Sequence, residues 1–80
     1  MELSDELKRR LRQQFADAQI SVQVQGSSAL LGVVSNEFEG RSQVQRQQLV
    51  YVLIGDLIQT GELHAVTIQA KTPSEIDDLA

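Results

Sequence analysis

The sequence contains no cysteine and only one histidine, His64, among its 80 residues. Without cysteine the chain can form no disulfide and can give no thiolate to a metal. The serines fall in expected turns and helix caps, so no set of nucleophile, base and orienting residue can be identified around the single imidazole. These absences predict a protein that binds rather than one that catalyses.

Long apolar segments are also missing. The longest apolar run, residues 49–54, is far shorter than the roughly 20 residues that cross a bilayer as a helix. The first six residues carry acids and no apolar stretch, so we expect no signal peptide. The chain has room for one hydrophobic core, and we expect a single domain over residues 1–80. The expectation is a soluble cytoplasmic protein that engages neither a membrane nor a small-molecule substrate.

Acidic residues outnumber basic ones, 11 against 7, which gives a net charge of −4 at pH 7. A domain that holds nucleic acid through its phosphates is normally basic. Four basic residues do gather within residues 8–12. We expect them on the solvent face of a helix, so the charge balance argues against a dedicated nucleic-acid binder.

The first half of the chain predicts a helix followed by a hairpin. Apolar residues recur every three or four positions over residues 3–18, which indicates an amphipathic helix, and Ser4 is expected to cap its start. Residues 20–24 alternate apolar and polar side chains, as a half-buried strand does. Residues 29–35 form a second, more apolar strand. The glycine-containing turn between them predicts an antiparallel hairpin.

The second half predicts a helical region, a strand and a last helix. Ser42 is a good N-cap for a region that runs to about residue 60, as one helix or as two separated at Gly55. Residues 63–70 alternate again, with His64 on the same face as two apolar side chains, and predict a third strand. Residues 72–75 combine a threonine cap, proline and glutamate in the capping-box pattern that opens a helix.

These elements together predict an α+β fold of two layers. Helices cover one face of a three-stranded mixed sheet. The hairpin strands must be antiparallel, whereas the third strand follows a long helical crossover and can pair in parallel.

Three local patterns, in this order along the chain, resemble the BolA family. They are Phe38-Glu39-Gly40 followed by Ser42, Val44, Arg46 and Val50-Tyr51; then Leu63-His64-Ala65-Val66; then Thr72-Pro73. The resemblance implies a class II KH-like fold with the order αββα(α)βα and a helix-turn-helix-like segment over residues 42–58.

The resemblance also implies a partner and a shared cofactor. BolA-like proteins are partners of monothiol glutaredoxins, and such pairs can share a 2Fe–2S cluster. The glutaredoxin and glutathione would supply thiolates, His64 an imidazole, and a His or Cys in the loop between the first two strands a second ligand. Here that loop is Gly26-Ser27-Ser28, so the second ligand is absent at Ser27 and Ser28. Docking without a cluster, a cluster with a weaker or external ligand, and a merely packed His64 all stay open.

The family's second activity is transcriptional regulation through DNA. Polar and basic side chains near the start of the helical region could meet a groove and its phosphates: Arg41, Gln43, Gln45 and Arg46. The alternative is that they solvate the outer turn of a helix, which the acidic chain favours. No pair of glycines has the Gly-x-x-Gly spacing of a KH-type clamp. We therefore expect a non-enzymatic adaptor first and a DNA-binding regulator second.

Overall fold

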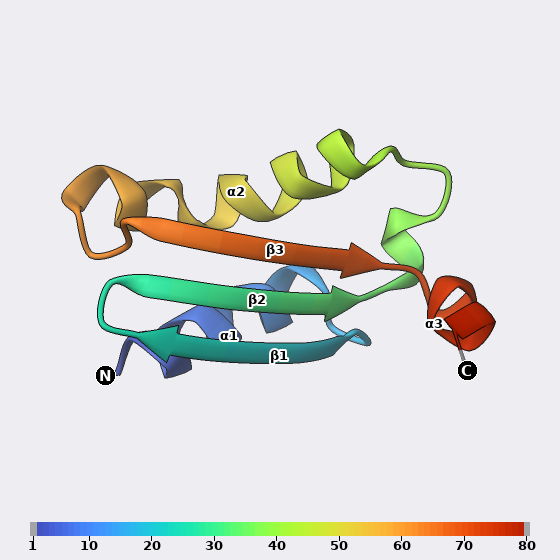
Figure 1. Ribbon diagram of the computed structural model, residues 1–80, viewed down its shortest axis with the longest axis horizontal. Coiled ribbons are helices and arrows are strands. Elements are labelled where there is room, and N and C mark those ends of the chain that lie inside the picture. The colour runs from blue at the N-terminus through green and yellow to red at the C-terminus, as the bar shows by residue number, and fades with distance from the viewer. Residues whose placement is uncertain (1, 80) are drawn as a thin grey trace.

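The computed structural model describes residues 2–79, with side chains up to residue 76, and has the predicted α+β architecture of two layers. Figure 1 shows the three strands lying side by side with α2 along the sheet. The elements in chain order are α1 (Leu3–Gln14), β1 (Gln19–Gln25), β2 (Ser28–Val34), the short 3-10 helix η1 (Asn36–Phe38), α2 (Gln43–Thr60), β3 (Ala65–Lys71) and α3 (Pro73–Leu79).

The sheet is mixed, with the strand order β1-β2-β3. β1 and β2 are antiparallel, and the facing pair Gln25 and Ser28 closes the hairpin. The two-residue turn between them needs a positive φ at its first position, which Gly26 supplies at 57°. β3 pairs with β2 in parallel, with Ala65 opposite Ser28. The hairpin turn and the start of β3 therefore lie at the same end of the sheet.

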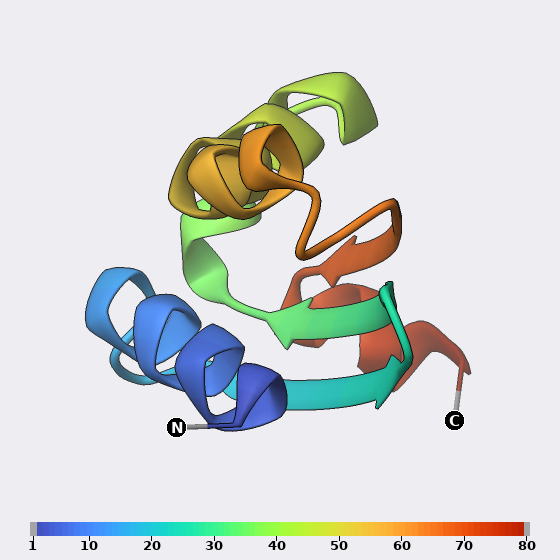
Figure 2. The same cartoon turned by 90° about the vertical axis from the view of Figure 1, so that its left-hand side faces the viewer.

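α1 and α2 cover one face of the sheet, as Figure 2 shows from the end of the molecule. α3 lies past the far end of β3 instead (Figure 1). The predicted apolar stripe of α1 enters the core, and the rings of Phe15 and Phe38 meet there with centroids 5.2 Å apart. The largest fully buried side chains are Phe15, Phe38, Leu7, Leu11, Leu31, Ile54, Leu63, Val33 and Val50.

Several predicted element boundaries differ from the structure by one or two residues, and two of them change the role of a serine. Ser4 does not cap α1, because the N-cap is Glu2, two residues earlier, and it makes no side-chain cap hydrogen bond. The second strand ends before Ser35 rather than including it. The Ser35 hydroxyl accepts a hydrogen bond from the N–H of Glu37 and so caps η1.

The start of β3 is a third correction, and it concerns the candidate site. Leu63 was predicted to open the strand, but its N–H donates to the carbonyl of Leu57 over 3.1 Å, so its backbone closes the C-terminal end of α2 instead. The strand begins at Ala65. His64 therefore precedes the strand and does not share a strand face with Val66.

α2 is one uninterrupted helix from Gln43 to Thr60. The helix-turn-helix-like segment predicted over residues 42–58 is therefore wrong, since no turn interrupts that range and Gly55 does not break it. Ser42 and Gln45 form the reciprocal capping box at its start, with hydrogen bonds of 3.2 and 3.0 Å. Gly61, with φ of 86°, ends it in the left-handed conformation.

Candidate functional site

His64 lies in the connection between α2 and β3 with an exposed side chain. Its backbone N–H donates to the carbonyl of Ser27 over 2.8 Å, and the N–H of Ala65 reaches the same oxygen over 3.4 Å. These bonds hold the β1–β2 turn against the start of β3 (left-hand end of the sheet in Figure 1). The structure thus brings together the histidine and the loop that the sequence pointed to.

The C-terminal end of α2 completes the surroundings of His64. A Cβ built onto Gly61 would lie 3.8 Å from Nε2 of His64. The imidazole therefore lies against the last turn of α2 on one side, while the backbone of His64 is bonded to the hairpin turn. An exposed side chain fixed through its backbone in this way is available to a partner without rearrangement of the fold.

The ligand chemistry of this site fits one part of a shared cluster. Within residues 2–79 no group of three or more His, Cys, Asp or Glu side chains could hold a metal ion. The nearby Ser27 and Ser28 offer hydroxyls, whereas iron–sulfur clusters select thiolate and imidazole ligands. Within the described residues His64 therefore has no companion ligands for a metal, and it would need ligands from another molecule to hold one.

Arg46 has a structural role that the sequence did not reveal. It was predicted to be a solvated or partner-facing charge, but the residue is only 6% exposed. Its Nε donates to the carbonyl of Arg41 over 3.0 Å, and its Nη1 donates to the carbonyl of Ala70 over 3.1 Å and to Oε1 of Glu75 over 2.7 Å. The guanidinium also lies 5.9 Å from the ring centroid of Phe38. That burial corrects the prediction.

The remaining candidates for DNA contact do not form a basic surface. The side chain of Gln45 is engaged in the capping box, and Nε of Arg41 donates to the carbonyl of Glu37 over 3.1 Å. Gln43 and Arg41 are exposed. With Arg46 buried, the structure leaves one exposed guanidinium among the four candidates, and their role with nucleic acid stays a prediction.

Glu75 on α3 forms an ion pair with the buried Arg46 on α2. Its Oε1 accepts from Arg46 and also from the N–H of Thr72 over 2.7 Å, which confirms the predicted capping box at residues 72–75. The hydrogen bond from Arg46, followed by the one from Thr72, lowers the pKa of Glu75 from 4.5 to about 2. The Glu75 carboxylate is therefore ionised at neutral pH.

The basic residues near the start of the chain are mostly engaged within the fold. Arg10 donates to both carboxylate oxygens of Asp56 on α2, over 2.6 and 3.0 Å, and to Glu6 over 2.7 Å. The hydrogen bond from Arg10 lowers the pKa of Asp56 below its usual range. Arg12 donates to the carbonyls of Ala16 and Ala18 beyond the end of α1. The link between α1 and α2 through Arg10 was not visible in the sequence.

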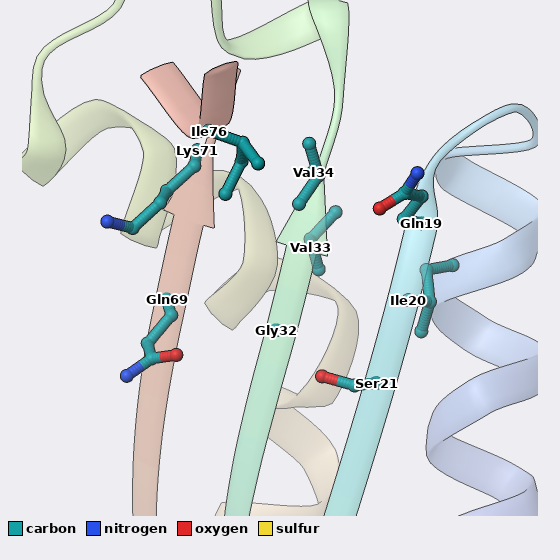
Figure 3. Close-up of a pocket in the computed structure, with 9 residues that line it drawn as sticks. All are labelled: Gln19, Ile20, Ser21, Gly32, Val33, Val34, Gln69, Lys71 and Ile76. Atoms are coloured by element: carbon teal, nitrogen blue, oxygen red, sulfur yellow. The ribbon is translucent and has the colours of Figure 1, made fainter. Parts of the chain in front are cut away.

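A hollow of about 340 Å³ lies on the open face of the sheet, toward the end of β3 and so away from His64. Figure 3 shows Ser21 beside Gly32, where a Cβ would lie 2.5 Å from the Ser21 hydroxyl oxygen. Lys71 is the single ionisable side chain among the lining residues, and its amine extends away from the hollow in Figure 3. This hollow brings no set of reactive groups together and is not part of the His64 site.

The comparison with protein families identifies the chain. Residues 12–75 match the family model described as BolA-like protein. The chain therefore belongs to the BolA family, which confirms the resemblance carried by residues 38–51, 63–66 and 72–73. Over residues 2–79, no helix has both the length and the apolar character needed to cross a membrane.

Similar proteins and structures agree with this assignment. The chain is 43% identical over 72 residues to an uncharacterized protein in the rpoN-murA intergenic region of Acinetobacter guillouiae, with 90% of this chain and 87% of that protein covered. It resembles the structure of BolA1 from Arabidopsis thaliana with a TM-score of 0.84 and 28% identity, covering 94% of this chain and 96% of that one. The BolA domain of SufE1 from Arabidopsis thaliana gives a TM-score of 0.85 and 29% identity, with the same coverage of both chains.

Proposed function

We propose that this protein is a non-enzymatic adaptor that binds a monothiol glutaredoxin and contributes His64 to a 2Fe–2S cluster shared with that glutaredoxin and glutathione. One observation carries the proposal. The exposed side chain of His64 lies just before β3, and the backbone N–H of His64 donates to the carbonyl of Ser27 and so fixes this residue against the hairpin turn. An adaptor needs a ligand that is presented outward and fixed before the partner arrives.

Because this chain offers one suitable cluster ligand at the site, the remaining ligands would come from the partner and glutathione. When bound, such a cluster supplies iron and one-electron chemistry, and an imidazole ligand in place of a thiolate raises its potential. Ser27 and Ser28 do not replace a second His or Cys. This chain therefore contributes one ligand, and docking without the cluster is part of the same proposal.

Charge placement supports this function over DNA binding. The chain carries a net charge of −4, and Arg46, the basic residue within α2, is buried in a pair with Glu75. A protein that holds DNA through its phosphates needs exposed Lys or Arg side chains along the helix that contacts the DNA. A DNA-binding regulator using residues 42–58 is the weaker alternative.

The decisive experiment combines the purified protein with a monothiol glutaredoxin, glutathione and an iron–sulfur source. Gel filtration should show a complex, and the visible absorption and circular dichroism spectra should show a 2Fe–2S cluster. His64→Ala is expected to alter the spectrum and shorten cluster retention, while Gln69→Ala, at the other end of β3, leaves both unchanged. Absence of a complex together with no effect of His64→Ala would refute the adaptor function.

The DNA alternative has its own test, which is a salt titration of DNA affinity. Binding through phosphates must weaken steeply as salt rises. A flat response with no binding at moderate salt would remove that alternative.

A further inference from the structure

β3 forms a free edge of the sheet. The strand order is β1-β2-β3, so no strand lies beside β3 on the side away from β2. The carbonyl of Lys71 accepts from the N–H of Ser35, which follows β2, whereas the carbonyl of Ala70 accepts from a side chain of α2. Because the direction of the backbone groups alternates along a strand, the N–H and C=O groups of Val66 and Ile68 also point away from β2.

The outward backbone groups of Val66 and Ile68 are unpaired. In the described part of the chain, no hydrogen bond outside the sheet reaches either residue. Edge strands are usually protected by a charged side chain, a proline or a bulge. Residues 65–70 contain no charge and no proline, and their register with β2 is continuous. β3 therefore presents a row of backbone donors and acceptors that can pair with an added strand.

α2 runs along this edge. In Figure 1 it lies beyond β3, on the side away from β2, and Figure 2 shows it in the same layer as α1, on one face of the sheet. A hollow of about 550 Å³ borders the edge near the end of β3, and its lining residues are Gln43, Ile68, Gln69, Ala70, Lys71 and Glu75. A strand paired with β3 would therefore have α2 against one of its faces, as the strands inside the sheet have a helix layer against theirs.

The side of α2 that borders the edge is uncharged and partly apolar. Arg10 on α1 donates to Asp56, so the side of α2 that carries Asp56 faces α1. At about 100° per residue, Gln47, Tyr51 and Ile58 lie about 140–180° around the helix from Asp56. Tyr51 is 38% exposed and Ile58 is 39% exposed. Apolar side chains of an added strand could cover both.

Lys71 places a positive charge at one end of this edge. Figure 3 shows its amine extending past β3 on the side away from β2. Glu75, the acidic residue of the hollow, accepts hydrogen bonds from Arg46 and from the N–H of Thr72. An acidic side chain of an added strand would meet the Lys71 amine. The fitting segment is thus extended, apolar at the alternate positions that face α2, and acidic near the end of β3.

A second copy of this chain does not fit the same place. If two β3 strands paired across a two-fold axis, both α2 helices would lie on the same face of the joined sheet. Because α2 lies beyond its own β3, each helix would occupy the space of the other. An extended segment without a helix of its own at that position avoids this overlap.

We propose that β3 and α2 bind an extended segment of another protein, which adds to the sheet as a fourth strand beside β3. Backbone hydrogen bonds to Val66 and Ile68 supply affinity, while Tyr51, Ile58 and Lys71 select the side chains of the segment. This site uses the free edge of β3 and not the imidazole of His64. It is therefore a binding activity beyond the proposed adaptor function.

The probe is a phage-displayed library of random eight-residue peptides, selected on the immobilised full chain. Enriched peptides should alternate apolar residues with others and carry an acidic residue. One such peptide is synthesised and titrated by calorimetry. N-methylation of the peptide amides that point to β3 should raise the Kd at least tenfold, because each methyl removes a ladder hydrogen bond. N-methylation of the intervening amides should change the Kd less than threefold. This comparison leaves the protein unaltered.

Variants of the protein locate the peptide. Tyr51→Glu and Ile58→Glu should each raise the Kd at least tenfold. Val52→Glu adds the same charge at an 82% exposed position on another side of α2 and should change the Kd less than twofold. Lys71→Glu should weaken binding of the acidic peptide, and replacing the acid of the peptide by lysine should restore it. Circular dichroism confirms that each variant is folded.

Three results would overturn the proposal. The first is a selection that enriches no peptide, and the second is equal loss of affinity for both N-methylation patterns or for Val52→Glu and Tyr51→Glu. The third is single-stranded oligothymidine that binds with an affinity lowered by Tyr51→Glu and displaces the peptide, which would assign the edge to nucleic acid. Sedimentation velocity must also show a monomer, since a dimer that Tyr51→Glu disperses would assign the edge to a second copy.

Discussion

Arg46 on α2 donates a 2.7 Å hydrogen bond from Nη1 to Oε1 of Glu75 on α3. The same nitrogen lies 3.1 Å from the carbonyl of Ala70, the buried residue near the end of β3. One nearly buried guanidinium thus joins two helices and the edge strand. Arg46 thus links α2, β3 and α3 at the end of the sheet opposite His64.

Replacement of Arg46 by methionine is expected to lower the free energy of unfolding by about 2 kcal/mol, because the buried carbonyl of Ala70 then lacks a donor. Arg46→Lys should recover only part of the loss, since an ammonium cannot reproduce the fork of the guanidinium. Urea denaturation at neutral pH measures both. Arg41→Met, at an exposed residue, is the control and should change stability by about 0.5 kcal/mol or less. Equal effects at the two arginines would contradict the structural role of Arg46.

Stability is expected to fall in acid through Glu75. Its pKa is depressed from 4.5 to about 2 in the folded state, so its contribution is complete above the unfolded value and is lost as pH falls toward the folded value. Urea midpoints measured from neutral pH into the acidic range should therefore decline. Glu75→Gln should be less stable at neutral pH and lose less on acidification.

The Arg46→Met background provides the control for this pH effect. There, Glu75→Gln should add little, because the charge that depresses the pKa of Glu75 is already gone. An undiminished effect of Glu75→Gln in that background would show that other contacts of the carboxylate dominate.

Gly55→Ala should stabilise the isolated protein. The added Cβ meets nothing within 4 Å, and alanine in a helix is favoured over glycine by about 0.5–1 kcal/mol. Thermal unfolding followed by circular dichroism measures this gain. A melting temperature that stays unchanged or falls in Gly55→Ala would contradict it.

Ser27→His should lengthen the lifetime of the shared cluster. The carbonyl of Ser27 is bonded to the backbone of His64, so a second imidazole placed there stands beside the first. Loss of the cluster to a chelator, followed by visible absorption, should be several-fold slower than in the wild-type complex. Gln69→His adds the same side chain at the other end of β3 and should have no effect. An unchanged lifetime in Ser27→His would show that the loop does not face the cluster.

Local patterns in the sequence were enough to predict most of the fold. The apolar spacing from Leu7 through Phe15 and the caps at Ser42 and Gly61 each depend on neighbours along the chain, and each is found in the structure. The parallel pairing of β3 followed from the length of the crossover that precedes it. The BolA family assignment rested on such local patterns too.

Contacts between distant segments could not be predicted in this way. Arg46 looked like a surface residue because Ala70 and Glu75, which accept its hydrogen bonds, lie far along the chain. His64 was placed on a strand by alternation, yet the hydrogen bond between Leu63 and Leu57 delays the strand start. The sequence pointed to His64 and to the loop around Ser27. That the two lie side by side depends on the parallel pairing of β2 and β3.

The absence of free charge on α2 has a kinetic consequence. Encounter between proteins is accelerated when opposite charges steer them together, and surfaces without such steering associate at roughly 10⁵–10⁶ M⁻¹s⁻¹. Because Arg46 and Asp56 each have an opposite charge as a partner within the protein, α2 offers little net local charge to an approaching molecule. Encounters along this helix would be slow and would gain little from local charge steering. Competing partners would then be distinguished mainly by how slowly they dissociate. The lifetime of the complex is also the time during which a cluster could pass from one protein to the other.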